Sequence, residues 1–175
     1  MANGGCYTRR GNPPKRGYEI PRLDQLGEIQ RNGVLMFPCM EYDDTPWTPW
    51  TKKLSDSRVA MISTAGLHLR GDQPFGGGDQ SYRVIPSSAE AGEIIMSHTS
   101  IGWDHTGFYK DLNLAFPMDR LRELEQRSVI GSVADDYYSF MGAQSNPVKM
   151  LEETGPETAR RMKAEGVDLV FMVPI

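Results

Sequence analysis

The side chains best suited to chemistry lie together in one short stretch. His98, Asp104, His105 and Asp111 fall within fourteen residues. Imidazole and carboxylate groups ligate divalent metals, hold substrate ammonium groups and move protons near neutral pH. Their spacing is not that of a helical metal motif such as H-E-x-x-H, so it predicts no metal geometry. Two interpretations stay open: a reaction site, or aspartates that cap turns beside histidines that form local hydrogen bonds.

A second group of candidates follows the first apolar run of the chain. His68 and Arg70 follow the run at 58–63 and the small residues 64–66, and Asp72 lies beside them. A histidine and an arginine after a strand suit contact with an anion or a carboxylate, whereas a surface ion pair between Arg70 and Asp72 is the alternative. Tyr137 could supply a hydroxyl to the same site, or it could lie at a solvated edge.

The elements that must position these residues are visible as short apolar runs and glycine-ended helices. The run RVAMIS ends in small residues, which is typical of a buried strand in an α/β sheet. We expect this strand at 58–63, a long surface loop at 67–80, strands at 82–85 and 93–97, a helix at 117–127, a helix with Ala159 and Met162 facing inward, and a strand at 167–173. The sequence therefore predicts an α/β fold, with a mainly parallel sheet and flanking helices.

The last predicted strand has an unusual position in such a fold. Pro174 and Ile175 follow it, at the point where an α/β protein normally turns into its next helix and places its chemistry. We therefore expect a sheet that is incomplete at its C-terminal edge, through truncation or because a partner chain completes it.

Three regions are expected along the chain. Residues 1–20 are rich in Gly, Pro and Arg and predict a flexible arm. Residues 21–57 predict a short helix that ends at Gly33, followed by a connector rich in Pro and Trp. Residues 58–175 form the α/β domain.

Composition excludes several classes of protein. A net charge of -4 and a pI near 5.4 give no electrostatic basis for binding nucleic acid or an anionic membrane. No apolar run reaches the roughly 20 residues needed to cross a bilayer, and no signal peptide is visible. We expect a cytoplasmic protein. Its two cysteines, Cys6 and Cys39, show no C-x-x-C or zinc-like spacing.

Several stretches resemble the selenoprotein B family, component B of the glycine, sarcosine, betaine and D-proline reductases. The stretches are DDTPWTPW, LSDSRVAMISTAGLHLRGDQPF, SYRVIP, SHTSIGWDHTGFYKDLNLAFPMDRLRELEQRSVIGSVADDYYSFMG and ARRMKAEGVDLVFMVPI. Together they extend over roughly residues 43–175. The long run from Ser97 to Gly142 is the most specific of them.

The resemblance implies a redox residue just beyond this chain. In that family the strand matching Val167–Pro174 is followed at once by selenocysteine, or by cysteine in some members. The expected chemistry is reductive. A selenolate attacks an activated carbon of an amine-type substrate, which a carbonyl group of a partner subunit has often captured first. The amine then leaves, and a dithiol restores the selenium. The chain would then be an amino-terminal portion, inactive alone. Beyond selenocysteine or cysteine after Ile175, no cofactor is predicted.

The resemblance places His98, Asp104, His105, Asp111 and Asn113 in the most recognisable block of the family, and His68 and Arg70 stay candidates from their position after the first strand. The catalytic candidates are His98, Asp104 and His105, as groups that orient substrate or deliver a proton to the leaving group; the substrate-binding candidates are His68, Arg70, Asp111, Asn113 and Tyr137. Tyr137 departs from the pattern, because some relatives carry histidine there. The expected partners are a small-molecule substrate and other reductase subunits. Two alternatives remain: a non-catalytic subunit that completes its sheet with a partner chain, and a metal-dependent hydrolase built on the three catalytic candidates.

Overall fold

The computed structural model describes residues 22–36, 43–46, 48–100 and 102–175. The chain divides into two compact units, Met1–Tyr42 and Asp43–Ile175. The predicted arm at 1–20 lies outside the described residues. In the first unit the structure describes a 3₁₀ turn, η1 (Leu23–Gln25), and a helix, α1 (Glu28–Leu35). The expectation that this helix ends at Gly33 was wrong, because α1 continues through that glycine to Leu35.

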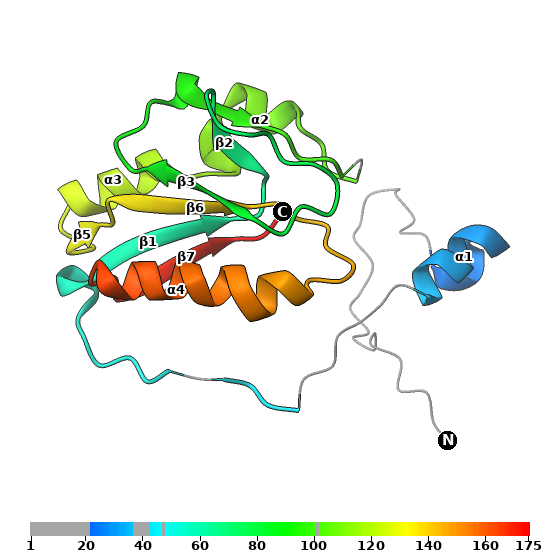
Figure 1. The fold of residues 1–175 in the computed structure, drawn as a ribbon, viewed down its shortest axis with the longest axis horizontal. Coiled ribbons are helices and arrows are strands. Elements are labelled where there is room, and N and C mark those ends of the chain that lie inside the picture. The colour runs from blue at the N-terminus through cyan, green and yellow to red at the C-terminus, as the bar shows by residue number, and fades with distance from the viewer. Residues whose placement is uncertain (1–21, 37–42, 47, 101) are drawn as a thin grey trace, which may run out of the picture. The chain divides into compact units, whose positions relative to one another are not determined.

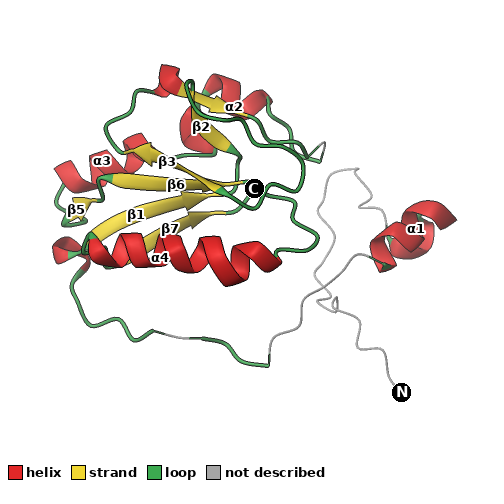
Figure 2. Cartoon of the chain, in the orientation of Figure 1, coloured by secondary structure: helices red, strands yellow, loops and turns green. Residues whose placement is uncertain are grey.

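The second unit has a main sheet with helices on both faces, and beside it a separate two-stranded sheet (Figures 1 and 2). Its strands are β1 (Arg58–Ser63), β2 (Leu67–Leu69), β3 (Tyr82–Pro86), β4 (Ile94–Met96), β5 (Ser132–Val133), β6 (Asp136–Phe140) and β7 (Leu169–Val173). Its α-helices are α2 (Thr106–Lys110), α3 (Met118–Gln126) and α4 (Gly155–Ala164). Short helical turns are η2 (Leu54–Asp56), η3 (Ala91–Glu93), η4 (Leu112–Leu114) and the π-helical η5 (Met150–Thr154).

The strand β1 is the centre of the main sheet. It pairs in parallel with β5 and β6 along one edge and with β7 along the other, and β3 pairs antiparallel with β6. The predicted α/β class with a mainly parallel sheet is therefore confirmed. Five predicted elements are also confirmed within a residue or two at each end: the strands β1, β3, β4 and β7 and the helix α3.

The two faces of the sheet carry separate cores. Val59 and Met61 of β1 pack with α3 residues on one face, whereas Ala60 of the same strand packs with Met162 of α4 on the other. This alternation follows from the two-residue repeat of a strand. In α4 the inward residues are Thr158 and Met162. Ala159, which was also expected to face inward, lines a pocket beside the sheet, although it is exposed and is not part of the buried core.

The loop expected at 67–80 contains a strand. β2 pairs antiparallel with β4, and Leu67 and His68 are buried. The polar and glycine-rich composition of this stretch concealed three residues that find their partner about 27 residues further along the chain. None of the helices in the described ranges is long and apolar enough to span a membrane.

Candidate functional site

The carboxyl ends of the parallel strands meet at one edge of the sheet. Thr64 follows β1, and Ile175 lies two residues beyond β7. The Ile175 N–H donates to Thr64 Oγ1 at 2.7 Å, and this hydroxyl donates to the Ile175 carbonyl oxygen at 3.1 Å. The Thr64 N–H also donates to the Val173 carbonyl oxygen at 3.1 Å. The end of β7 is therefore fixed to the end of β1 through one threonine.

His98 is brought to the same edge by two glycines. Gly66 has a φ of +63°, and a Cβ there would lie 3.2 Å from His98 Cα, so the absence of a side chain lets the His98 backbone pack against the end of β1. A Cβ on Gly142 would lie 3.0 Å from His98 Nε2, 2.9 Å from the Thr64 carbonyl oxygen and 2.5 Å from that of Ile175. Gly142 thus marks the point where the His98 ring, Thr64 and Ile175 converge.

The hydrogen bonds of His98 define its protonation state. The Ser100 N–H donates to His98 Nδ1 at 3.2 Å, so the neutral ring carries its proton on Nε2. The residue is 8% exposed, and Nε2 has no hydrogen-bond partner among the described residues. Burial lowers the pKa of His98, and the nearby His105 lowers it further. Near neutral pH, His98 is therefore a neutral donor whose Nε2–H lacks an acceptor.

Trp103 links the two histidines of the predicted catalytic group. Its ring centroid lies 5.1 Å from that of His98 and 5.0 Å from that of His105, both in edge contact. The two imidazole centroids are 6.1 Å apart. His105 Nε2 is also buried without a partner in the part of the chain that is described. The structure therefore brings His98 and His105 together around an indole ring.

Asp104, the third catalytic candidate, forms a local hydrogen bond with the first residue of α2. Its Oδ1 accepts a hydrogen bond from the Thr106 N–H at 2.9 Å, and the side chain is exposed. Hydrogen bonds from Thr106 lower the pKa of Asp104, and the neighbouring His105 adds to the effect. Asp104 thus stays ionised next to His105, and its catalytic role remains a prediction.

Asp111 and Asn113 belong to a network that joins η4 to α3. Asp111 Oδ1 accepts from the N–H and the side-chain amide of Asn113, each at 2.9 Å. Asn113 in turn binds Asp119 through Nδ2 to Oδ2 at 2.9 Å, and its Oδ1 accepts from the Asp119 N–H at 3.1 Å. These hydrogen bonds lower the pKa of Asp111. The network fixes the start of α3. The assignment of Asp111 and Asn113 to substrate binding stays a prediction.

The remaining candidates lie at different places in the fold. His68 sits on β2 with Nδ1 2.8 Å from the Leu69 carbonyl oxygen, and Arg70 donates to the Gly92 carbonyl oxygen at 3.2 Å. Tyr137 lies on β6 with its ring against Phe116 in the core on the α3 face. It is fully buried, its hydroxyl has no partner among the described residues, and burial raises its pKa to about 12. Their assignment to substrate binding remains a prediction.

Sequence reasoning missed Thr64 and Gly142 as residues of this site. Both are small residues that follow strands, and small residues after parallel strands allow backbone and side chains to approach closely at the sheet edge. That signal was readable for Thr64, but Gly142 lay in a stretch whose strand was not recognised. Within the described residues no cluster of three or more His, Cys, Asp or Glu side chains has the arrangement of a metal site.

Fold and site together define an α/β protein with a buried, donor-bearing histidine at the carboxyl edge of its parallel strands. A family model described as glycine/sarcosine/betaine reductase selenoprotein B matches residues 35–174. The chain belongs to this family of reductase component B proteins, as its sequence motifs predicted.

Three relatives illustrate the kinship. The chain is 42% identical over 127 residues to the D-proline reductase subunit gamma of Acetoanaerobium sticklandii, which covers 72% of this chain and 52% of the relative. It is 26% identical over 140 residues to the sarcosine reductase complex component B subunit beta of Peptoclostridium acidaminophilum, covering 78% and 32%. It is 27% identical over 153 residues to the glycine reductase complex component B subunit gamma of Carboxydothermus hydrogenoformans, covering 81% and 33%.

The chain thus spans about half the length of the D-proline reductase relative and about a third of the other two. No solved structure gives a significant match to it.

Proposed function

We propose that this chain forms the amino-terminal portion of a reductase that cleaves a small amine-type substrate, with selenocysteine or cysteine directly after Ile175 as the redox residue. The observation that carries the proposal is the convergence at Gly142, where the Nε2–H of His98, which has no partner among the described residues, approaches Ile175 just beyond β7. A residue that follows Ile175 would emerge beside this donor. Kinship with D-proline, sarcosine and glycine reductase subunits supports the substrate class.

The proposed reaction has three steps. The selenolate or thiolate attacks the substrate carbon that carries nitrogen, a carbon–selenium or carbon–sulfur bond forms, and the carbon–nitrogen bond breaks. The amine leaves with a proton. A thiolate then attacks the selenium or sulfur, and the released carbon takes a proton. A dithiol finally reduces the resulting selenium–sulfur or disulfide bond, so the substrate gains the two electrons that the dithiol loses.

In this scheme His98 stabilises the nucleophile in its ionised form. Its Nε2–H would donate to the selenolate or thiolate, and a buried site strengthens such a charge-assisted hydrogen bond. The ring would remain neutral, because burial lowers the pKa of His98. Thr64 would fix the backbone from which the nucleophile extends. Asp104 and His105 lie next to this group as candidates for delivering the proton to the leaving amine.

The gene gives the first test. The codon after that of Ile175 is expected to be UGA or a cysteine codon, followed in frame by a further cysteine-containing coding stretch. A UAA or UAG codon with unrelated sequence behind it would contradict the proposal.

A thiol added to the protein gives the second test. A cysteine placed directly after Ile175 is expected to ionise below the ordinary thiol pKa of about 8.5, measured from the pH dependence of its alkylation rate. His98→Ala should raise that pKa, whereas His68→Ala, which removes a histidine on β2, should not. If the added cysteine has an ordinary thiol pKa, and if His98→Ala leaves that pKa unchanged, then His98 has no part in the proposed mechanism.

Activity itself is tested in a chimera. Residues 35–175 would replace the matching portion of the A. sticklandii D-proline reductase subunit gamma, in the presence of the other subunits of that reductase. We expect dithiol-dependent reduction of D-proline, glycine, sarcosine or betaine, and a loss of about a hundredfold or more in kcat with His98→Ala. A folded chimera that reduces none of these substrates would refute the substrate class.

A further inference from the structure

The outer edge of β7 is open. All five residues of this strand are apolar, and β7 pairs only with β1 among the strands that the structure describes. Phe171 is 47% exposed and Met172 is 67% exposed. Natural edge strands are usually protected by lysine, proline or a bulge, and the sequence of β7 has no lysine or proline. The edge therefore has the character of an interior strand that lacks a neighbour.

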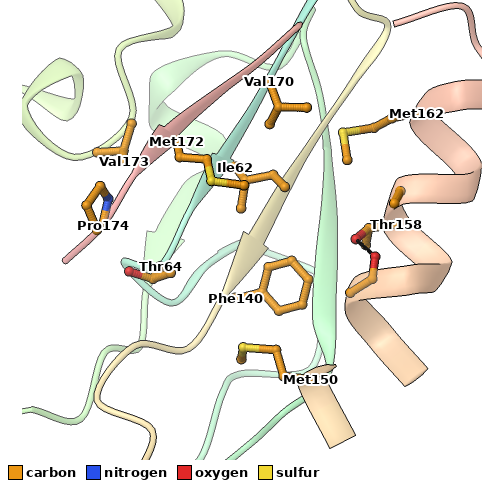
Figure 3. Close-up of a pocket in the computed structure, with 12 residues that line it drawn as sticks. Ile62, Thr64, Phe140, Met150, Thr158, Met162, Val170, Met172, Val173 and Pro174 are labelled. Carbon is orange, nitrogen blue, oxygen red and sulfur yellow. Dashed lines mark hydrogen bonds between the residues drawn. The ribbon is translucent and has the colours of Figure 1, made fainter. Parts of the chain in front are cut away.

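An apolar pocket of about 410 Å³ lies beside β7, between the sheet and α4 (Figure 3). Its apolar lining includes Ile62, Phe140, Met150, Ala159, Met162 and Met172. The two hydroxyls in its wall are already used: Thr158 donates to the Gly155 carbonyl oxygen at 2.8 Å, and Thr64 bonds with Ile175. Small-molecule sites need free polar groups to orient a ligand. This pocket therefore suits apolar protein side chains.

The handedness of the fold connects the pocket with the open edge. The chain runs from β6 through α4 to β7, passing over β1, and α4 covers the face that carries Ala60 and Ile62 (Figure 1). Crossovers between parallel strands are right-handed in about 98% of cases. A further parallel strand added outside β7 continues in the same direction across the sheet. Its connecting helix must then lie on the α4 face, over the pocket.

We propose that the edge of β7 and the pocket together are the docking surface for one helix–strand unit that follows Ile175 in the complete polypeptide. Its strand would pair in parallel with β7, and the apolar side of its helix would enter the pocket. The D-proline reductase relative has the length for this unit, because the match covers 52% of it. The inference rests on the proposed function, since it takes the redox residue to lead from β7 into this helix.

The test uses the 175-residue chain and a fusion in which the unmatched part of the A. sticklandii D-proline reductase subunit gamma follows Ile175. Hydrogen exchange is measured on both. We expect slower exchange of the β7 amides in the fusion, together with slower exchange around Ala159 and Met162. Unchanged exchange at these positions in a folded fusion would overturn the proposal.

Variants sharpen the test. Met172→Asp places a charge on the apolar surface and should restore fast exchange of β7 in the fusion, by about tenfold or more. Tyr109→Asp is the matched control, because Tyr109 is also exposed but lies on α2, and it should have no effect. Circular dichroism shows whether each variant folds. If Met172→Asp folds and leaves β7 protected, the helix–strand unit does not dock there.

Further outcomes separate the docking proposal from dimer formation and from the proposed reductase function. If the 175-residue chain alone forms a dimer with β7 protected, a second copy occupies the surface and the proposal fails. If the fusion shows the expected protection but a cysteine after Ile175 has an ordinary pKa and no reductase activity, the docking surface stands and the proposed function fails. Reductase activity without protection at β7 would refute the docking surface alone.

Discussion

At the scale of single residues, the proposed chemistry depends on the neutral state of His98. Its Nδ1 accepts a backbone hydrogen bond and its Nε2 is buried next to Gly142, so the fold favours the uncharged ring. The pKa of His98 in the folded protein is lower than in the unfolded chain. Folding thus disfavours protonation of the His98 side chain, and the free energy of unfolding is therefore lower at low pH.

His98→Gln is expected to weaken the pH dependence of stability. An ordinary histidine has a pKa of about 6.5, so as pH falls through that value the unfolded chain binds a proton that the folded chain resists, and the free energy of unfolding decreases. The loss ends below the lowered folded pKa. Denaturant titrations of both proteins between about pH 8 and about pH 5 should show a smaller decrease in the variant. Equal decreases would mean that burial does not perturb His98.

Gly142 is expected to tolerate no side chain. Because a Cβ there would lie 2.5 Å from the Ile175 carbonyl oxygen and 2.9 Å from that of Thr64, the end of β7 must move in Gly142→Ala. We expect a loss of about 1–3 kcal/mol in the free energy of unfolding. Gly76→Ala is the control: no atom lies within 4 Å of its Cβ position, and its effect should stay below about 1 kcal/mol. Equal effects of the two variants would argue against a close approach at Gly142.

At the scale of elements, Glu165 connects the end of α4 to the sheet. Its Oε1 accepts from the Arg58 guanidinium at 2.8 Å and also from the Asp135 N–H, so one carboxylate holds the starts of β1 and β6. The hydrogen bond with Glu165 raises the pKa of Arg58 against the opposing effect of burial. The side chain of Glu165 is 19% exposed, which sets it apart from the surface pairs on the helices.

Glu165→Ala should therefore lower the free energy of unfolding by about 1–3 kcal/mol, because Arg58 and the Asp135 N–H lose an acceptor that is partly shielded from water. The control is Glu123→Ala on α3, where the pair with Arg120 is about half exposed. That change should cost no more than about 0.5–1 kcal/mol. Urea denaturation of both variants measures the difference, and a Glu165 effect as small as the control would show that this connection contributes little.

At the scale of the whole second unit, the two edges of the main sheet differ in character. The edge strand β3 contains Arg83 and Pro86, whereas β7 and the pocket beside α4 present apolar surface to solvent. Apolar surface of this kind normally marks an interaction site. The 175-residue chain should therefore behave as a folded protein that carries one exposed apolar surface.

The fluorescent dye anilinonaphthalene sulfonate, whose aromatic rings bind exposed apolar surface, is expected to bind the native 175-residue chain at the pocket. Ala159→Leu should reduce the bound fluorescence and raise the free energy of unfolding by about 0.5–2 kcal/mol, because the added side chain fills the pocket. Ala164→Leu, on an exposed part of α4 outside the pocket lining, should change neither. Dye binding that is insensitive to Ala159→Leu would place the exposed apolar surface elsewhere.

The amino-acid sequence by itself determined the fold class, the family and several elements of this protein. β1, α3 and β7 were predicted because apolar runs, apolar periodicity and a starting proline act over a few neighbouring residues. The family could be recognised because its most specific run is continuous in the chain. The concentration of His98, Asp104 and His105 was equally visible, since these residues are neighbours in sequence.

Only the tertiary structure decided which of those residues meet. Thr64 and Ile175 are 111 positions apart, and β-sheet pairing alone joins them and brings Gly142 and His98 beside them. The burial of Tyr137 likewise depends on which face of β6 packs on α3, and the strand β2 exists because β4 offers it a partner. Local patterns carry no information about such pairings, because the free energy that fixes them comes from contacts between distant segments.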